Sequence, residues 1–196
     1  PNDADSDDDG IYEADYGDAP DPAYPSFKAN SGANHITSDS EWLGSDVNSE
    51  ENSKQINKDE YDDGVIFTFN AQNKLTKIEV TVGASNAANA ARYDAGTDGK
   101  RIYLNAWIDS NGNGSWADAG DRIIGTGSGK TYLGRPDDTF TIDSAAESWT
   151  GDAMTYVFNL ASPADWPVGS YARVRLSYGE DAGISGTALY GEVEDY

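Results

Sequence analysis

The sequence predicts an all-β fold, an antiparallel and jelly-roll-like β-sandwich with a long acidic loop region near its N-terminus. Apolar and polar residues alternate along seven or eight short stretches, which is the period of a strand with one buried face. Gly, Asn, Asp and Pro separate these stretches, as expected of short strands joined by turns. A chain of 196 residues is long enough for one domain with a sizeable core.

The N-terminal third carries few strand patterns. Residues 1–10 contain five aspartates and almost no apolar side chain, so we expect an acidic linker over residues 1–14 and a single domain over residues 15–196. Residues 23–62 are predicted to form a long loop region with short ordered pieces. A loop of this length in a compact domain is usually functional or held by a ligand, and a metal ion would serve.

Strand patterns follow one another from Gly64 onward. Ile102, Leu104, Ala106 and Ile108 share one face of the central stretch, and we expect only that face to be buried. The other predicted strands lie near 65–69, 78–82, 121–124, 140–142, 154–160, 170–178 and 191–196. Residues 86–92 are rich in alanine and are predicted to form a helical turn.

A possible metal site follows this central stretch. Asp109, Asn111 and Asn113 occupy positions 1, 3 and 5 of a D-x-[DN]-x-[DN]-G pattern, and Gly114 supplies the bend at position 6. Calcium takes roughly six to eight oxygens at about 2.3–2.6 Å, which requires such a tightly curled backbone. The carbonyl of Ser115 and the carboxylate of Asp118 or Asp121 would complete a strand–loop–strand Ca²⁺ site.

The alternative for this stretch is a polar Asn-Gly hairpin that binds nothing, because such turns are common between strands. Position 12 is Gly120 instead of the bidentate glutamate of the helix–loop–helix form. We favour calcium because a short hairpin has no need of several convergent acids and amides.

The chain ends in a second acidic pattern. In a strand, Glu192, Glu194 and Tyr196 face one side, while Val193 and Asp195 face the other. Two carboxylates on one face require a positive partner, and two candidates remain open. One is the pair Arg173 and Arg175, and the other is a second calcium ion held by several of Asp15, Asp18, Asp62, Asp63, Glu192, Glu194 and Asp195.

Composition excludes several functions. The net charge of −22, from 13 basic and 35 acidic residues, disfavours nucleic acid and anionic membrane surfaces as partners. The sequence has no cysteine and no apolar run of the ~18 residues that membrane insertion needs. Because it begins at Pro1, without an initiator Met or a signal sequence, we expect it to be a piece of a longer protein.

We expect no catalysis. His35 is the only histidine, and no G-x-S-x-G pattern accompanies it, so we interpret it as a hydrogen-bonded structural residue. A glycosidase built on paired carboxylates is the catalytic alternative, but among 35 acidic residues such pairs arise by chance.

Several motifs in a fixed order resemble the GEVED domain, a module of large secreted bacterial proteins. They are Asp15-Tyr-Gly-Asp-Ala-Pro20, His35, Leu43-Gly44, Asp62-Asp-Gly-Val65, the block that begins at Leu104, Arg173-Val-Arg-Leu-Ser177 and the closing Gly191-Glu-Val-Glu-Asp-Tyr196. The resemblance covers about residues 15–196. It implies an extracellular, non-catalytic β-sandwich, a monomeric accessory module attached to enzymes, adhesins or surface proteins.

Aromatic residues suggest a ligand class. Trp42, Tyr132, Trp149 and Trp166 lie in polar or Gly/Pro-rich segments, where flat rings could stack on the sugars of a polysaccharide or another cell-surface component. The alternative is that these rings close the ends of the sandwich, as large aromatics usually do. The sequence therefore predicts either a calcium-binding polysaccharide module or an adhesion spacer in which calcium only adds stability.

Overall fold

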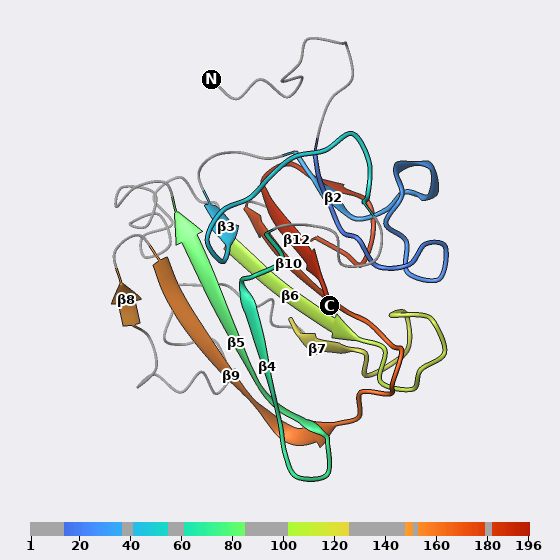
Figure 1. Ribbon diagram of the computed structural model, residues 1–196, viewed down its shortest axis with the longest axis vertical. Coiled ribbons are helices and arrows are strands. Elements are labelled where there is room, and N and C mark those ends of the chain that lie inside the picture. The colour runs from blue at the N-terminus through green and yellow to red at the C-terminus, as the bar shows by residue number, and fades with distance from the viewer. Residues whose placement is uncertain are drawn as a thin grey trace.

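The computed structural model describes residues 14–36, 41–54, 61–84, 102–125, 148–150, 153–178 and 182–196, and in these ranges the fold is nearly all β (Figure 1). The first strands are β1 (Asp15–Tyr16), β2 (Asn34–His35), β3 (Glu41–Leu43), β4 (Val65–Phe69) and β5 (Leu75–Ala84), with a 3-10 helix, η1, at Lys28–Asn30. The later strands are β6 (Ile102–Ile108), β7 (Arg122–Ile124), β8 (Ser148–Thr150), β9 (Ala153–Ala164), β10 (Ala172–Tyr178), β11 (Thr187–Ala188) and β12 (Gly191–Asp195).

Two antiparallel sheets form the sandwich. In the five-stranded sheet, β5 pairs with β9 on one side and with both β3 and β4 on the other, and β8 pairs with β9. The four-stranded sheet has the order β12-β10-β6-β7. The predicted antiparallel sandwich is therefore confirmed.

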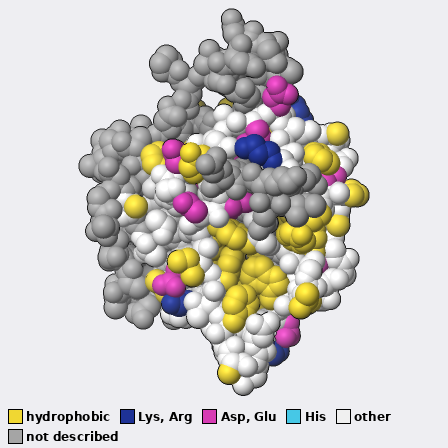
Figure 2. Space-filling view, in the orientation of Figure 1, with side chains coloured by type: hydrophobic (Ala, Val, Ile, Leu, Met, Phe, Trp, Pro, Cys, Tyr) yellow, Lys and Arg dark blue, Asp and Glu magenta, His cyan; other side chains and the backbone are white. Residues whose placement is uncertain are grey.

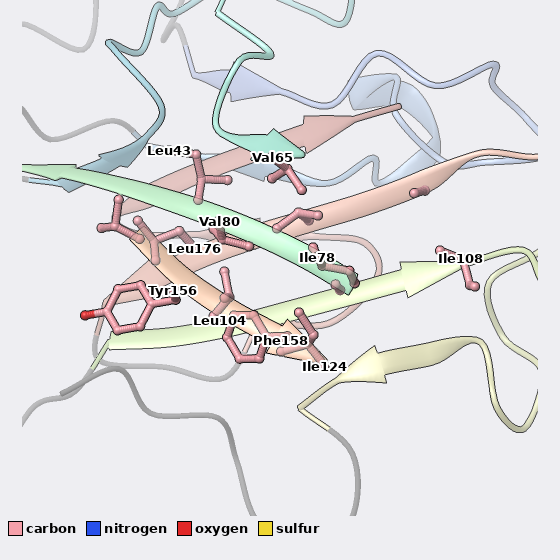
Figure 3. Packing of buried hydrophobic residues seen from close by; sticks show 14 of the residues in the cluster. Leu43, Val65, Ile78, Val80, Leu104, Ile108, Ile124, Tyr156, Phe158 and Leu176 are labelled. Carbon is pink, nitrogen blue, oxygen red and sulfur yellow. The ribbon is translucent and has the colours of Figure 1, made fainter. Parts of the chain in front are cut away.

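The hydrophobic core lies between these two sheets (Figure 3). Alternate residues of each strand point into it, and each buried aliphatic side chain contributes about 1.5–3 kcal/mol by leaving water. The five-stranded sheet supplies Leu43, Val65, Leu75, Ile78, Val80, Val82, Tyr156 and Phe158, and the four-stranded sheet supplies Leu104, Ala106, Ile108, Ile124, Ala172, Val174 and Leu176.

A third layer covers the other face of the four-stranded sheet. It contains the small sheet β1-β2-β11, in which β1 and β2 are antiparallel and β2 and β11 are parallel. A second cluster of buried residues, Ala19, Tyr24, Trp107 and Trp116, lies between this layer and β6. Side-chain packing against the four-stranded sheet thus holds this part of the N-terminal region in place.

This layer overturns one expectation. Leu104, Ala106 and Ile108 of β6 point into the sandwich as predicted, but Asn105 and Trp107 on the opposite face are also buried. The sequence pattern indicated an exposed face because the residues there are polar or amphipathic. They are covered because residues 14–36 and 182–188 pack over them and supply hydrogen-bond partners, among them the carbonyl of Ala182 for the Asn105 amide.

The other strand predictions agree with β4, β5, β7, β9, β10 and β12, although β5 and β9 are longer than expected. The long loop region contains η1, β2 and β3 as its short ordered pieces. The predicted linker (except Ala14), the helical turn at 86–92 and the strand at 140–142 lie outside the described residues. Among the described residues, no helix is long and apolar enough to span a membrane.

Candidate functional site

The predicted calcium loop joins β6 to β7. Backbone hydrogen bonds fix both of its ends: the Asp109 N–H donates to the Tyr171 carbonyl at 3.1 Å, and the Ile108 N–H donates to the Asp121 carbonyl at 2.9 Å. Asp109 and Asp121 are completely buried at these ends, whereas Asn111, Asn113 and Asp118 are exposed.

Asp109 acts as the internal support of the loop. Its Oδ1 accepts N–H bonds from Gly112 at 2.7 Å and Asn113 at 3.1 Å, and its Oδ2 accepts from Gly114 N–H at 2.9 Å and Tyr24 O–H at 2.6 Å. Burial raises the pKa of Asp109, but the bonds from Tyr24 and the three N–H groups outweigh it and lower the pKa below its usual value. These four donors occupy the acceptor positions that a metal would need.

Positive φ angles allow this arrangement. Gly112 has φ 71° and Gly114 has φ 81°, a region in which residues with a Cβ are strained. The backbone can therefore curl until successive N–H groups point at one carboxylate, as expected from the glycine at position 6.

Asp121 performs a similar task at the other end. Its Oδ1 accepts from Ser110 Oγ at 2.9 Å and its Oδ2 accepts from the Asp118 N–H at 3.1 Å. The Ser115 hydroxyl accepts the Ala117 N–H at 3.1 Å. Of the predicted ligands, Asp109 and Asp121 hold the backbone, and the Ser115 side chain supports the turn that follows it.

The exposed side of the loop brings the remaining three candidates together. Asp118 Oδ2 accepts from Asn111 Nδ2 at 3.0 Å and from Asn113 Nδ2 at 2.5 Å. In this form the two amides stabilise the carboxylate charge by donating hydrogen bonds to it. Rotation of each amide would instead turn its carbonyl oxygen towards the same point, which is the donor type that calcium prefers. Among the described residues, no three acidic or histidine side chains converge closely enough to hold a metal by themselves.

Sequence reasoning missed Tyr24 as a partner of this loop. It lies 85 residues from Asp109 in the chain, and its ring packs on Trp116 with centroids 4.6 Å apart. Burial and the bond to Asp109 raise the pKa of Tyr24 above its usual value, so it remains a donor. A lone tyrosine in a Pro-rich segment gives no local signal of such a role.

The closing strand β12 has the predicted faces. Its register with β10 pairs Glu192 with Leu176 and Glu194 with Val174, so both glutamates point towards the inside of the sandwich. Asp195 pairs with Arg173 and points towards the third layer. Arg173 and Arg175 therefore cannot be the partners of Glu192 and Glu194, because they lie on the opposite face of the sheet.

Glu194 connects the two main sheets. Its Oε1 accepts from the N–H groups of Asp63 at 3.0 Å and Gly64 at 2.7 Å, and its Oε2 accepts from Tyr196 O–H at 2.9 Å. The Tyr196 oxygen in turn accepts the Val65 N–H at 3.0 Å. Burial raises the pKa of Glu194 to about 8, against these hydrogen bonds, which lower it.

Glu192 makes the corresponding contact at the end of β3, where its Oε2 accepts the Leu43 N–H. Burial, followed by the charges of Asp15, Glu194 and Asp62, raises the pKa of Glu192 well above its usual value. Asp15 accepts the Val193 N–H at 2.6 Å. Glu192 therefore lies within electrostatic reach of three other acidic residues, Asp15, Asp62 and Glu194.

The other members of the second predicted site have separate tasks. Asp63 accepts from the Ser45 N–H at 2.9 Å and hydroxyl at 2.7 Å, and Asp18 is buried. Asp195 forms a two-pronged ion pair with Arg173, Nε to Oδ1 at 2.7 Å and Nη2 to Oδ2 at 2.6 Å, in which both side chains are fully buried. Asp195 therefore does not join the carboxylates on the inner face.

Two arginines and the histidine attach the third layer. Arg173 Nη1 donates to the carbonyls of Pro25 and Ile184, and Arg175 donates to four carbonyls, those of Asn34, Gly183, Ser185 and Gly186. Arg175 Nε donates to His35 Nε2 at 3.0 Å, so the His35 proton is on Nδ1, which donates to the Tyr190 carbonyl at 3.0 Å. Burial and the Arg175 charge hold the pKa of His35 well below its usual value. His35 is a hydrogen-bonded structural residue, as predicted.

Comparison with protein families identifies the part of the chain that contains both features. Residues 103–196 match the family model of the GEVED domain. This part of the chain is similar to a GEVED domain. Comparisons with curated proteins and with solved structures gave no match.

The GEVED match begins in β6 and ends at Tyr196, so it includes the loop and the closing motif. GEVED domains are modules of larger proteins. The folded unit extends beyond the matched range, because β3, β4 and β5 lie outside it and share the core with the matched strands.

The two aromatic candidates whose side chains the structure describes, Trp42 and Trp166, lie at opposite ends of β5. Trp42 pairs with Gly83 at one end of β5, whereas Trp166 follows Ala164, which pairs with Leu75 at the other end. Tyr132 and the Trp149 side chain lie outside the described residues. A platform made of all four rings therefore stays a prediction.

Trp166 instead belongs to a different aromatic group. The Trp166 ring lies edge-on to the Phe67 ring, with their centroids 4.7 Å apart, and its centroid lies 5.6 Å from that of Phe69. Phe67 also packs on Tyr196. Figure 2 shows hydrophobic side chains gathered on this face beside β4 and the C-terminus. Phe69 is 40% exposed. Pro167, which follows Trp166 in the chain, lies beside Gly112 of the candidate calcium loop, because a Cβ built on Gly112 would be 3.2 Å from the Pro167 Cβ.

Proposed function

We propose that this chain is a non-catalytic, calcium-binding accessory module of a secreted multidomain bacterial protein. The observation that carries the proposal is the convergence of Asn111, Asn113 and Asp118 on the exposed side of a loop that two buried carboxylates hold in shape. The exposed oxygens suit Ca²⁺, and Asp109 could join the ion only by giving up a hydrogen bond. A non-catalytic role is supported by His35, since a buried neutral imidazole with both nitrogens bonded cannot act as a base.

Calcium should raise the thermal stability of the folded chain. Binding to the folded state alone adds about 2.7 kcal/mol at a hundred times Kd, which corresponds to a Tm increase of roughly 5–10 °C for a domain of this size. The measurement is thermal unfolding in EDTA and in a calcium titration. Metal analysis of the purified protein tests for an ion that EDTA does not remove.

Asp118→Ala is the informative variant. It removes the exposed carboxylate on which the two amides converge, so we expect it to lose the calcium response while its Tm in EDTA stays near that of the wild type. Asp109→Ala would not separate these effects, because it also removes four hydrogen bonds that shape the loop. Asp165→Ala, in an exposed ion pair with Lys74, is the matched control. A calcium response that survives in Asp118→Ala places the ion elsewhere.

For the ligand of the module we propose a neutral polysaccharide at a cell surface. Phe69 supports this proposal, because its ring is 40% exposed and packs on the half-buried Trp166, whose neighbour Pro167 lies beside the candidate calcium loop. A net charge of −22 disfavours anionic polymers. The alternative is an adhesion spacer in which calcium serves stability alone.

Affinity electrophoresis in gels that contain neutral polysaccharides separates these alternatives. If Phe69 is an anchor, Phe69→Ala should weaken retention about tenfold, the effect of losing one well-packed aromatic contact. Ile36→Ala, at a residue with a similar exposure of 38%, should leave retention unchanged. Equal retention of the wild type and Phe69→Ala would remove this surface as the binding site, and no retention at all would favour the spacer.

A further inference from the structure

The loop between β6 and β7 contains a feature that calcium binding does not explain. Asn111-Gly112 and Asn113-Gly114 are the only two Asn-Gly dipeptides in the sequence, and they follow each other directly. Both asparagine side chains are exposed. Asn-Gly is the dipeptide in which asparagine deamidates most readily, because glycine has no side chain to hinder the approach of its own nitrogen.

The chemistry needs only water. The glycine nitrogen attacks Cγ of the preceding asparagine, a new N–C bond closes a succinimide ring, and the side-chain nitrogen leaves as ammonia with the proton from the backbone N–H. Water then opens the ring at either carbonyl and leaves aspartate or isoaspartate. The glycine nitrogen must therefore give up its proton and its hydrogen bond before the ring can close.

In the structure, both glycine nitrogens are engaged in hydrogen bonds to Asp109. The N–H of Gly112 donates to Asp109 Oδ1 at 2.7 Å, and the N–H of Gly114 donates to Asp109 Oδ2 at 2.9 Å. A nearby negative charge opposes the loss of the proton from each nitrogen. Asp109 is itself fixed, because it is completely buried and accepts the hydroxyl of Tyr24.

We propose that Asn111 and Asn113 are deamidation sites and that Asp109 controls their rate of deamidation. Their conversion changes the loop from one in which two amides satisfy the Asp118 carboxylate to one in which three carboxylates require a cation. Asp118 accepts hydrogen bonds from both asparagine amides. After deamidation, positions 111 and 113 carry carboxylates that cannot donate, and three negative charges converge. The cation requirement deepens the proposed function and rests on it, whereas the control of the rate by Asp109 does not.

The rate is tested by peptide mapping and mass spectrometry of the full chain during incubation at mildly alkaline pH. We expect conversion at Asn111 and Asn113 to be slow in the folded wild type and about tenfold faster in Asp109→Ala, the effect of releasing one charge-assisted hydrogen bond. The wild type in denaturant gives the unprotected rate. Asn73, which is exposed and precedes Lys74, is the internal control and should remain intact in both proteins.

Asp109→Ala could also unfold the loop, so a second variant is needed. Tyr24→Phe removes only the hydroxyl that holds Asp109, and circular dichroism shows whether it stays folded. Faster conversion at positions 111 and 113 in folded Tyr24→Phe supports control through Asp109. Equal rates in the wild type, Asp109→Ala and Tyr24→Phe would overturn it.

The cation requirement is tested with the double variant Asn111→Asp/Asn113→Asp. Its Tm in EDTA should fall several degrees below that of the wild type, and calcium should restore it, since each like-charge contact is relieved by the ion. The same calcium response in both proteins would overturn this half of the proposal. A response in the double variant alone would leave the inference intact and show that the asparagine form does not bind calcium. If neither protein responds, the cation requirement and the proposed function both fail, while the deamidation rates still decide the role of Asp109.

Discussion

Replacing Arg173 by alanine is expected to destabilise the folded state by about 3–5 kcal/mol, because it leaves a buried carboxylate without its counter-charge. Arg173 and Asp195 are fully buried and share two hydrogen bonds. Arg173 also donates to the carbonyls of Pro25 and Ile184 in the third layer. The free energy of unfolding, measured by denaturant titration, tests this expectation.

Two comparisons make the result specific. Lys74→Ala breaks the exposed ion pair with Asp165 and should cost less than about 1 kcal/mol. The double variant Arg173→Met/Asp195→Leu should be less destabilised than Arg173→Ala, since no unpaired charge remains. A cost for Arg173→Ala no greater than that for Lys74→Ala would show that the third layer does not depend on the ion pair.

The free energy of unfolding should fall as the pH rises from about 6.5 to 8. Folded Glu194 keeps its proton up to a pKa of about 8, whereas the unfolded chain releases it near the ordinary value of 4.5. The folded state therefore binds more protons in this window, and stability is lost as the pH rises through it. The loss from Glu194 over this window is roughly 2 kcal/mol.

The lower limit of the window is set by His35. The pKa of His35 is lowered in the folded state. Below the ordinary value of 6.5 the unfolded chain therefore binds more protons at this residue, and stability rises with pH instead of falling. Above that pH the imidazole is neutral in both states, and the raised pKa of Glu194 sets the direction of the change.

Denaturant titrations across the window in EDTA provide the measurement. Glu194→Gln should flatten the fall, while Glu79→Gln, on the outer surface beside Lys77, should retain it. Stability that is constant or rises over this range in the wild type would contradict the expectation. If calcium abolishes the fall, a cation binds beside the glutamates, as predicted for the second site.

Most strands could be predicted from local pattern, because a two-residue period is a property of neighbouring residues. β4, β5, β9 and β10 each have an alternation that places apolar side chains against the core. The faces of Glu192, Glu194 and Asp195 also followed from that period alone. The partners of the two glutamates did not follow, because Leu43 and Gly64 lie 149 and 130 residues away from them in the chain.

The candidate loop shows the same division. The spacing of Asp109, Asn111, Asn113 and Gly114 predicted a curled loop after a strand, and the structure contains one. The spacing could not separate the acids that shape the loop from those that face solvent. That difference depends on burial and on Tyr24, which reaches Asp109 from the third layer.

The sequence by itself determined the all-β class, the strand–loop–strand motif, the alternating faces of the closing strand and the GEVED resemblance, because each depends on residues close together in the chain. Only the tertiary structure decided that both faces of β6 are buried and that Arg173 pairs with Asp195 instead of with the two glutamates. Only it placed the carboxyl groups of Glu192 and Glu194 against backbone N–H groups of the facing sheet. The physical reason is that burial and hydrogen-bond partners are set by which segments pack together, and strand periodicity carries no information about the segment on the other side.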